Sequence, residues 1–189
     1  MWQLLAPPNL LTLARLACVP PLLYLTYAES ASALLGALGV FLFAVVTDWA
    51  DGYLARVWDQ STRLGTLLDQ VVDKILVLSV LFVSVERGML PMWLVLLNLF
   101  REFLISDFRQ LAAAQEKTVG ANWMGKTKFV LQVVLICLIY AVLAADAAGT
   151  PVPGGQPSVF WFAAGTTVLS YAFAARFFWL DGTVDIEKD

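Results

Sequence analysis

One stretch near the middle of the chain indicates what kind of fold the protein adopts. It reads Asp69-Gln70-Val71-Val72-Asp73-Lys74-Ile75-Leu76-Val77-Leu78-Ser79-Val80-Leu81-Phe82-Val83. After Lys74 the run carries no charge, which is typical of a helix that crosses a lipid bilayer in about 20 apolar residues. Asp73 would enter the membrane with this helix, and a carboxylate in that position needs a compensating charge.

The composition of the whole chain agrees with a membrane protein. Of its 189 residues, 60% are hydrophobic and 14% are charged, which is too few polar side chains to cover a soluble domain. The net charge of -3 offers no basic surface for nucleic acid, and the apolar excess excludes a disordered chain. Cys18 and Cys137 lie in separate apolar runs and the chain has no histidine, which argues against a disulfide or a zinc site.

Six apolar stretches have the length of a membrane span. They cover residues 10–27, 33–50, 71–86, 89–106, 127–145 and 158–179. We therefore expect an all-α integral membrane protein with six transmembrane helices, in which Pro20-Pro21 kinks the first. Residues 1–8 could add a short interfacial helix. No repeat or linker is evident, so residues 1–189 are expected to form a single domain.

The basic residues predict how the chain is oriented. With six spans, Arg87 is the only one of the 12 lysines and arginines assigned to the outside. Basic residues favour cytoplasmic loops, so both termini and the loops after the second and fourth spans should be cytoplasmic.

Four aspartates border the second and third spans. On a helix, Asp48 and Asp51 share one face, and Asp69 and Asp73 share another. Two helices joined by a short loop are antiparallel neighbours, so these faces can meet at the cytoplasmic side. Three small residues lie near them and would let the backbones or a ligand approach closely: Gly52, Ala55 and Gly65.

These carboxylates are either solvated loop charges or ligands of a cation. Asp59 fits the first interpretation, whereas Asp69 and Asp73 fit it poorly because an apolar helix follows directly. Clustered carboxylates repel one another and take up protons unless cations neutralise them. A ligand set made only of oxygen selects hard cations such as Mg²⁺, Mn²⁺ or Ca²⁺. The residues alone thus favour a divalent-cation site.

The spacing of these residues resembles the signature of the CDP-alcohol phosphotransferase family. The matching pattern is Asp48-x-x-Asp51-Gly52-x-x-Ala55-Arg56-x8-Gly65-x3-Asp69-x3-Asp73. The resemblance implies a six-helix membrane enzyme, homodimeric, that transfers a phosphatidyl or similar group from a CDP-linked donor to an alcohol and releases CMP. Gln70 stands where many members have proline, which affects the backbone and none of the ligands.

The resemblance also implies a role for each matching residue. Asp48, Asp51, Asp69 and Asp73 would bind two divalent cations, Mg²⁺ or Mn²⁺, and Asp73 would also be the general base. Gly52, Ala55 and Gly65 would make room for the cytidine nucleotide. Arg56 would either bind a phosphate of the donor or hold the two helices together. Asn9, Thr12 and Arg15 share a stripe of the first span, where they would either help to bind the donor nucleotide or cap and anchor the helix.

A second cluster of basic residues bears on the acceptor. Arg101 follows an apolar run and should lie at membrane depth, whereas Lys117 and Lys128 are explained by cytoplasmic anchoring. Arg101, Arg109 and Lys126 could converge on an anion, which would suit an acceptor that carries its own phosphate.

Two segments around this cluster resemble the phosphatidylglycerophosphate synthases of the same family. They match R-E-x-x-x-S-x-x-R from Arg101 to Arg109 and W-x-G-K-x-K-x-x-x-Q from Trp123 to Gln132, with Phe129 where many such enzymes have threonine. The resemblance implies transfer from CDP-diacylglycerol to glycerol 3-phosphate, a lipid-embedded donor, and a location in the bacterial inner membrane with a cytoplasmic active site.

Other functions stay open at this stage. Within the family, the acceptor could be inositol phosphate, serine or phosphatidylglycerol. A divalent-cation channel or transporter could also use the four aspartates, although they gather at one end of the spans and the last two spans have almost no polar groups to complete a path. A catalytically inactive scaffold is a third alternative, which the presence of all four aspartates disfavours.

Overall fold

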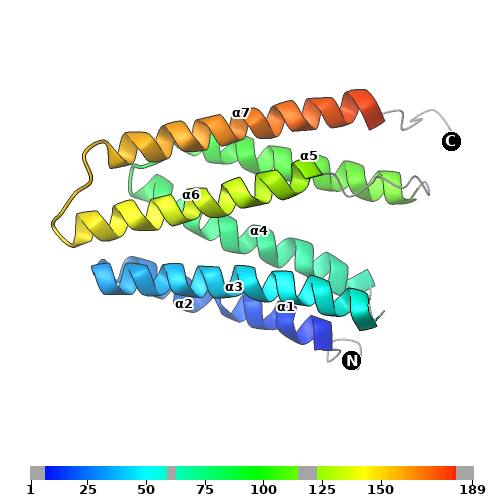
Figure 1. Ribbon diagram of the computed structural model, residues 1–189, viewed down its shortest axis with the longest axis horizontal. Coiled ribbons are helices and arrows are strands. Elements are labelled where there is room, and N and C mark those ends of the chain that lie inside the picture. Colours follow the sequence, from blue (N-terminus) through cyan, green and yellow to red (C-terminus); the bar gives the residue numbers. More distant parts are fainter. Residues whose placement is uncertain (1–6, 59–62, 115–122, 182–189) are drawn as a thin grey trace. The chain divides into compact units, whose positions relative to one another are not determined.

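The computed structural model describes the backbone of residues 7–58, 63–114 and 123–181, and side chains within residues 12–48, 71–72, 74–108 and 125–176. All regular structure in these ranges is α-helical, as expected. The helices, drawn in chain order from blue to red in Figure 1, are α1 (Pro7–Ala17), α2 (Val19–Tyr27), α3 (Ala31–Trp58), α4 (Arg63–Glu86), α5 (Met92–Ala114), α6 (Trp123–Ala147) and α7 (Gly155–Asp181). The expected interfacial helix over residues 1–8 falls largely outside the described residues.

The first expected span consists of two helices rather than one kinked helix. α1 ends at Ala17 and α2 begins at Val19, so the break lies at Cys18, ahead of the proline pair. Proline has no N–H and its ring collides with the carbonyl four residues earlier, so Pro20 and Pro21 cannot continue α1. Both are tolerated in the first turn of a new helix, where N–H groups have no partner within the helix. The first bond of α2 runs from the Leu22 N–H to the Cys18 carbonyl at 3.0 Å.

The chain forms two compact units. The first comprises Met1–Val83 and Cys137–Gly155, and the second comprises Ser84–Ile136 and Gln156–Asp189. The first unit therefore holds α1 to α3, nearly all of α4 and the second half of α6. The second unit holds α5, the first half of α6 and α7.

In the first unit, α3 packs against both α1 and α2. Its buried residues recur three and four positions apart, which places them on one face of the helix: Leu34, Ala37, Phe41 and Ala44. Gly36 lies against α2, because a Cβ atom there would be 3.6 Å from a methyl group of Leu25. Small residues at such positions let two helices approach closely within a membrane.

A buried hydrogen bond joins α2 to the second half of α6. The Thr26 hydroxyl donates to the Leu22 carbonyl at 2.7 Å and lies 2.9 Å from the Tyr140 hydroxyl, which we take as the donor because the proton of Thr26 is engaged. Both side chains are completely enclosed.

Replacing Tyr140 by phenylalanine is expected to lower the free energy of unfolding by about 1 kcal/mol, since it removes one buried hydrogen bond and no apolar contact. The thermal midpoint of the purified protein in detergent measures this change. Tyr24→Phe is the matched control, because the Tyr24 side chain is 78% exposed. Equal midpoints for the two variants would contradict the prediction.

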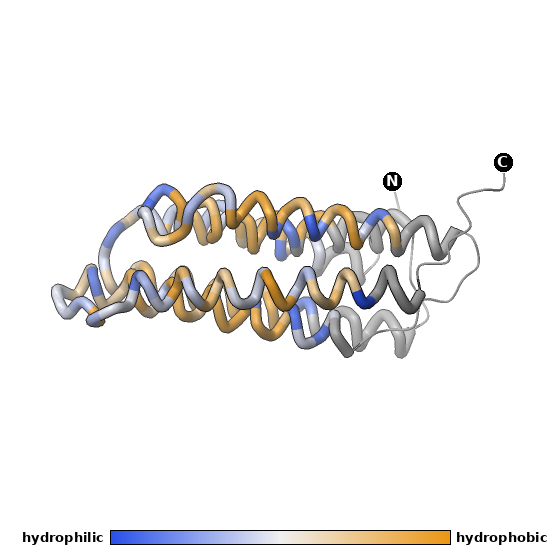
Figure 2. Tube along the Cα trace, turned by 90° about the horizontal axis from the view of Figure 1, so that it is seen from above, coloured by the Kyte–Doolittle hydropathy of each residue, from blue (hydrophilic) through white to orange (hydrophobic). Residues whose placement is uncertain are grey.

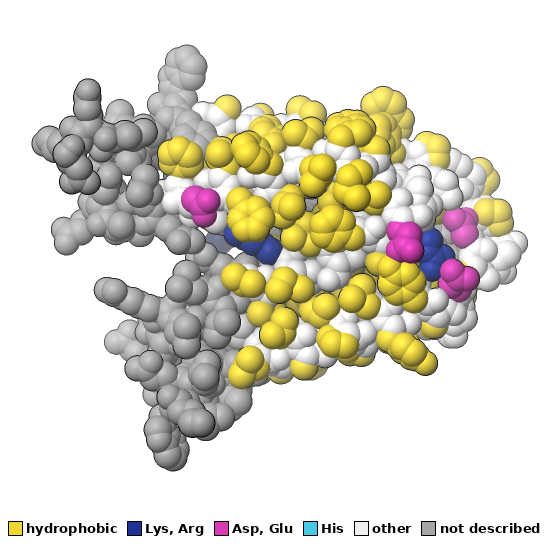
Figure 3. Space-filling model, turned by 180° about the vertical axis from the view of Figure 1, so that it is seen from behind, with side chains coloured by type: hydrophobic (Ala, Val, Ile, Leu, Met, Phe, Trp, Pro, Cys, Tyr) yellow, Lys and Arg dark blue, Asp and Glu magenta, His cyan; other side chains and the backbone are white. Residues whose placement is uncertain are grey.

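Three helices in the described part of the chain are long and apolar enough to cross a membrane: Ala31–Asp48 of α3, Gly125–Ala147 of α6 and Gly155–Arg176 of α7. Figure 2 shows apolar residues along the length of the helices, and Figure 3 shows a face on which most coloured side chains are apolar and the charged ones form two small groups. Large apolar side chains such as Phe43, Trp161 and Val168 are more than half exposed. This pattern is that of a helical membrane protein whose outer faces contact lipid.

Candidate active site

The four aspartates of the signature lie on two helices, as expected. Asp48 and Asp51 are in α3, and Asp69 and Asp73 are in α4. The spacing of three and four residues within each pair places its members on one helix face. Among these carboxylates, the structure describes only the side chain of Asp48, and the other three side chains lie outside the described ones.

Asp48 is held by an arginine from α1. Arg15 Nη1 donates to Asp48 Oδ1 at 2.5 Å, across 33 positions of sequence. The Arg15 side chain is 1% exposed and that of Asp48 is 27% exposed. A buried guanidinium is costly unless a carboxylate pairs with it, so this contact stabilises both charges and fixes the position of the Asp48 carboxylate.

The expected stripe on the first span is present in part. Thr12 is buried one turn before Arg15, and both lie on α1. The side chain of Asn9 lies outside the described ones. The sequence does not show whether this stripe binds the donor or anchors the helix. The ion pair between Arg15 and Asp48 connects the stripe to the aspartates on α3.

The donor set suits a hard divalent cation. The candidate ligands offer only carboxylate oxygens, and the contact with Arg15 orients the Asp48 carboxylate, as a metal ligand requires. The helices that carry the four aspartates also carry the remaining residues of the signature: Gly52, Ala55 and Arg56 in α3, and Gly65 in α4. The side chains of Ala55 and Arg56 lie outside the described ones.

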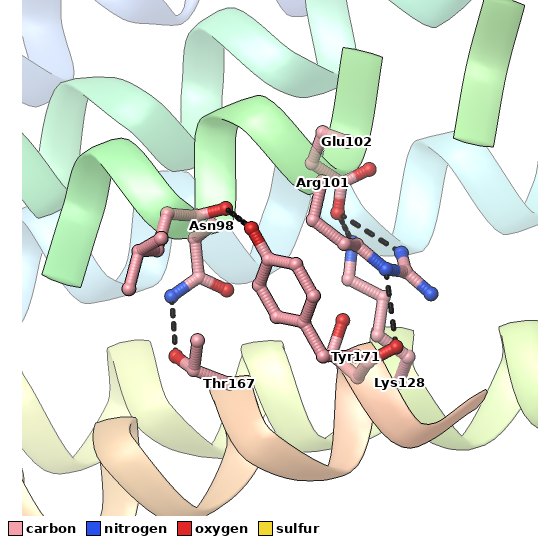
Figure 4. Close-up of polar contacts among 8 residues, drawn as sticks. Asn98, Arg101, Glu102, Lys128, Thr167 and Tyr171 are labelled. Carbon is pink, nitrogen blue, oxygen red and sulfur yellow. Dashed lines mark hydrogen bonds and ion pairs between the residues drawn. The ribbon is translucent and has the colours of Figure 1, made fainter. Parts of the chain in front are cut away.

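The basic cluster of the second unit centres on Arg101 of α5. This residue is 7% exposed, its Nε donates to the Ser170 carbonyl of α7 at 3.3 Å, and its Nη1 lies 3.7 Å from Glu102 Oε1. The same Glu102 oxygen pairs with Lys128 Nζ from α6, as Figure 4 shows. Arg101 thus lies in the interior, where it is compensated by one carboxylate and one helix carbonyl.

The three residues expected to bind the acceptor phosphate differ in their surroundings. Arg101 is buried within the cluster, whereas Lys126 is exposed. Arg109 lies on α5, and its side chain is outside the described ones. Lys128, which sequence reasoning explained as a cytoplasmic anchor, instead contacts Glu102. The second motif contains both Lys126 and Lys128, so the sequence did indicate a lysine near this cluster. It does not tell which of the two lysines faces α5.

Polar groups on α7 were also missed. Asn98 of α5 donates through Nδ2 to the Thr167 hydroxyl at 2.6 Å and to the Leu94 carbonyl at 3.2 Å. Tyr171 donates to the Leu97 carbonyl at 2.9 Å. We expected almost no polar groups in the last span that could complete an ion path, and the polar side chains of Thr167 and Tyr171 are engaged in hydrogen bonds. Figure 4 shows the bonds of Thr167 and Tyr171 to α5, and the Thr167 hydroxyl also donates to the Ala163 carbonyl of its own helix.

Comparison with known proteins shows the class to which the chain belongs. The family model for CDP-alcohol phosphatidyltransferase matches residues 5–169, so the chain is a member of that family of membrane-bound transferases. This confirms the prediction made from the aspartate signature. The family is generally dependent on divalent cations.

Individual relatives carry a more specific name, "CDP-diacylglycerol--glycerol-3-phosphate 3-phosphatidyltransferase". The relative from Salmonella choleraesuis is 38% identical over 134 residues, with 68% of this chain and 73% of the relative covered. The relative from Bacillus subtilis is 34% identical over 142 residues, and that from Escherichia coli K12 is 37% identical over 134, with the same coverage.

Proposed function

We propose that this protein transfers a phosphatidyl group from CDP-diacylglycerol to the 1-hydroxyl of sn-glycerol 3-phosphate and releases CMP, a step of phospholipid biosynthesis. The observation that carries this proposal is the buried guanidinium of Arg101, accompanied by Lys128, in a chain whose family takes its donors from CDP-alcohols. Arginine is suited to bind phosphate, which this acceptor supplies. The names of the relatives support the same acceptor.

In the proposed reaction, the acceptor hydroxyl attacks the phosphorus that bears the diacylglycerol. The new P–O bond forms as the bond to CMP breaks, and CMP leaves with the electron pair. Asp73 accepts the proton of the hydroxyl. Asp48, Asp51, Asp69 and Asp73 would hold two divalent cations, Mg²⁺ or Mn²⁺, which when bound offset the negative charge of the pyrophosphate. Arg15 orients Asp48 for this role.

The remaining site residues are assigned to the two substrates. For the donor, the proposal includes Asn9, Thr12, Gly52, Ala55, Arg56 and Gly65. For the acceptor phosphate, it includes Arg101, Arg109 and Lys126. Glu102 pairs with both Arg101 and Lys128, so its carboxylate offsets part of their positive charge.

The proposal extends to the organisation of the chain in the membrane. We propose six spans in the bacterial inner membrane, with the active site and both termini in the cytoplasm, and a homodimeric assembly. A family match that covers residues 5–169 supports a single catalytic domain over residues 1–189. The one-sided distribution of basic residues supports the orientation.

The proposal is tested by measuring CMP release from purified protein in detergent, with CDP-diacylglycerol, Mg²⁺ and one of four acceptors. These are glycerol 3-phosphate, inositol phosphate, serine and phosphatidylglycerol, and EDTA is the control. We expect metal-dependent release with glycerol 3-phosphate alone. Release with another acceptor would contradict the proposed acceptor but leave the proposed reaction type in place. No release with any of the four would contradict the proposal that the protein is this kind of transferase.

Replacing Arg109 by alanine is expected to raise the KM for glycerol 3-phosphate about 10-fold or more, because a hydrogen bond between charged groups is lost. The KM for CDP-diacylglycerol should change much less. Steady-state kinetics with each substrate varied in turn measure both values. Lys117→Ala, which removes a charge assigned to cytoplasmic anchoring, is the matched control. Equal effects of Arg109→Ala on both substrates would remove Arg109 from the acceptor site.

A further inference from the structure

The contacts between α5 and α7 recur at helical spacing. On α5 they involve Leu97, Asn98 and Arg101, and on α7 they involve Thr167, Ser170 and Tyr171. Asn98 and Arg101 are three residues apart, as are Thr167 and Ser170. Residues at this spacing lie on one face of a helix. The contacts therefore form a seam along which the two helices are joined.

The bond between Asn98 and Thr167, at 2.6 Å, is the shortest of the three that form this seam. The Thr167 hydroxyl accepts from Asn98 at 2.6 Å and donates to the Ala163 carbonyl at 2.7 Å. Since the other Asn98 proton goes to the Leu94 carbonyl, both amide protons are engaged. Bonds linked in this way polarise and strengthen one another, and in an apolar setting they are costly to leave unmade.

The bond between Asn98 and Thr167 bears on what Arg101 can contact. The Arg101 Nε donates to the main-chain carbonyl of Ser170, whose position depends on the axial and rotational placement of α7 against α5. One turn away, the bond between Asn98 and Thr167 joins the same two helices and so contributes to that placement. The direction of the Arg101 guanidinium therefore depends on a residue in the last helix of the chain.

We infer that Thr167 is a positioning residue for the acceptor site, acting through Asn98 and the placement of α7 to orient Arg101 toward the acceptor phosphate. This inference rests on the proposed function, because it assumes that Arg101 binds that phosphate. Ser170 and Tyr171 lie beyond the residues matched by the family model, so family membership by itself does not predict this contact.

The variant Thr167→Val tests the inference, because valine keeps the shape of threonine and removes the hydroxyl. A hydrogen bond between membrane helices corresponds to an effect of about 3- to 15-fold. We expect the KM for glycerol 3-phosphate to rise by this factor, with kcat and the KM for CDP-diacylglycerol within about 2-fold of wild type, because Arg101 contributes binding energy to the acceptor throughout the reaction. Thr167→Ser, which restores the hydroxyl, should return the KM to the wild-type value.

Thr166 provides a matched control one position away. Its hydroxyl also donates to the Ala163 carbonyl, at 2.9 Å, so Thr166→Val makes the same chemical change and leaves the seam intact. Tyr171→Phe is the second variant, in case Thr167→Val does not fold. It removes the bond to the Leu97 carbonyl and should raise the same KM in the same direction.

The outcomes distinguish the inference from the proposed function. If wild type releases CMP with glycerol 3-phosphate, and Thr167→Val leaves its KM unchanged or raises the KM values of both substrates equally, the inference is wrong and the function stands. If wild type instead uses inositol phosphate, the proposed acceptor is wrong. The same variants are then measured with inositol phosphate, because a positioned Arg101 would act on that phosphate as well.

Discussion

Replacing Asp73 by asparagine is expected to reduce the rate of CMP release at least about 1,000-fold. Asparagine has nearly the same size, but it cannot accept the proton of the acceptor hydroxyl, and a positioned general base contributes about 100- to 10,000-fold. It is also a weaker ligand for a divalent cation than a carboxylate, which adds to the loss. Initial rates of CMP release at saturating substrates measure the effect.

Asp59→Asn is the matched control for this variant, because it makes the same chemical change at an aspartate outside the signature. It should retain activity close to that of wild type. The thermal midpoint in detergent separates a loss of chemistry from a loss of folding. Substantial turnover by a folded Asp73→Asn protein would remove Asp73 from the role of general base.

Replacing Arg15 by methionine is expected to lower kcat/KM about 10- to 100-fold, the effect found when a residue that supports a metal ligand is removed. Methionine keeps much of the buried volume but leaves Asp48 without the guanidinium that contacts its Oδ1 atom. The cation concentration for half-maximal activity should rise. A second readout needs no turnover, because the increase in thermal midpoint caused by Mg²⁺ should shrink.

Two further variants make the Arg15 experiment specific. Arg15→Lys keeps the positive charge and should recover part of the Mg²⁺ effect. Arg176→Met removes an exposed arginine of α7 and should change neither readout. If Arg15→Met lowers the thermal midpoint but leaves the response to Mg²⁺ unchanged, Arg15 supports the fold and has no part in placing Asp48.

Much of the site could be predicted from sequence because its spacing is local. Asp48 and Asp51 share a helix, as do Asp69 and Asp73, and a helix places residues three or four apart on one face wherever it lies. The length of each apolar stretch likewise predicts a membrane span, whichever helices pack beside it. The proline pair predicted a distortion near residue 20, but the break occurred at Cys18 because proline acts on the turn that precedes it.

The contacts between helices could not be predicted in the same way. Arg15 and Asp48 are 33 positions apart, and Asn98 and Thr167 are 69 apart. In a soluble helix, the apolar stripe shows which face packs inward. In a membrane helix, the faces toward lipid and toward protein are both apolar, so the pattern does not distinguish them. For the same reason, the sequence did not indicate that Lys128 would contact Glu102 while Lys126 would be exposed.

The amino-acid sequence by itself therefore determined the helical membrane class, the family, and the residue types of the proposed reacting centre, because each depends on composition or on spacing within one helix. The tertiary structure was needed to show that Arg15 holds Asp48 and that α7 holds Arg101. Those pairings depend on which helix faces meet. Several faces of each helix are equally apolar in sequence, and the faces that meet are those on which buried charges and hydrogen-bonding groups find partners.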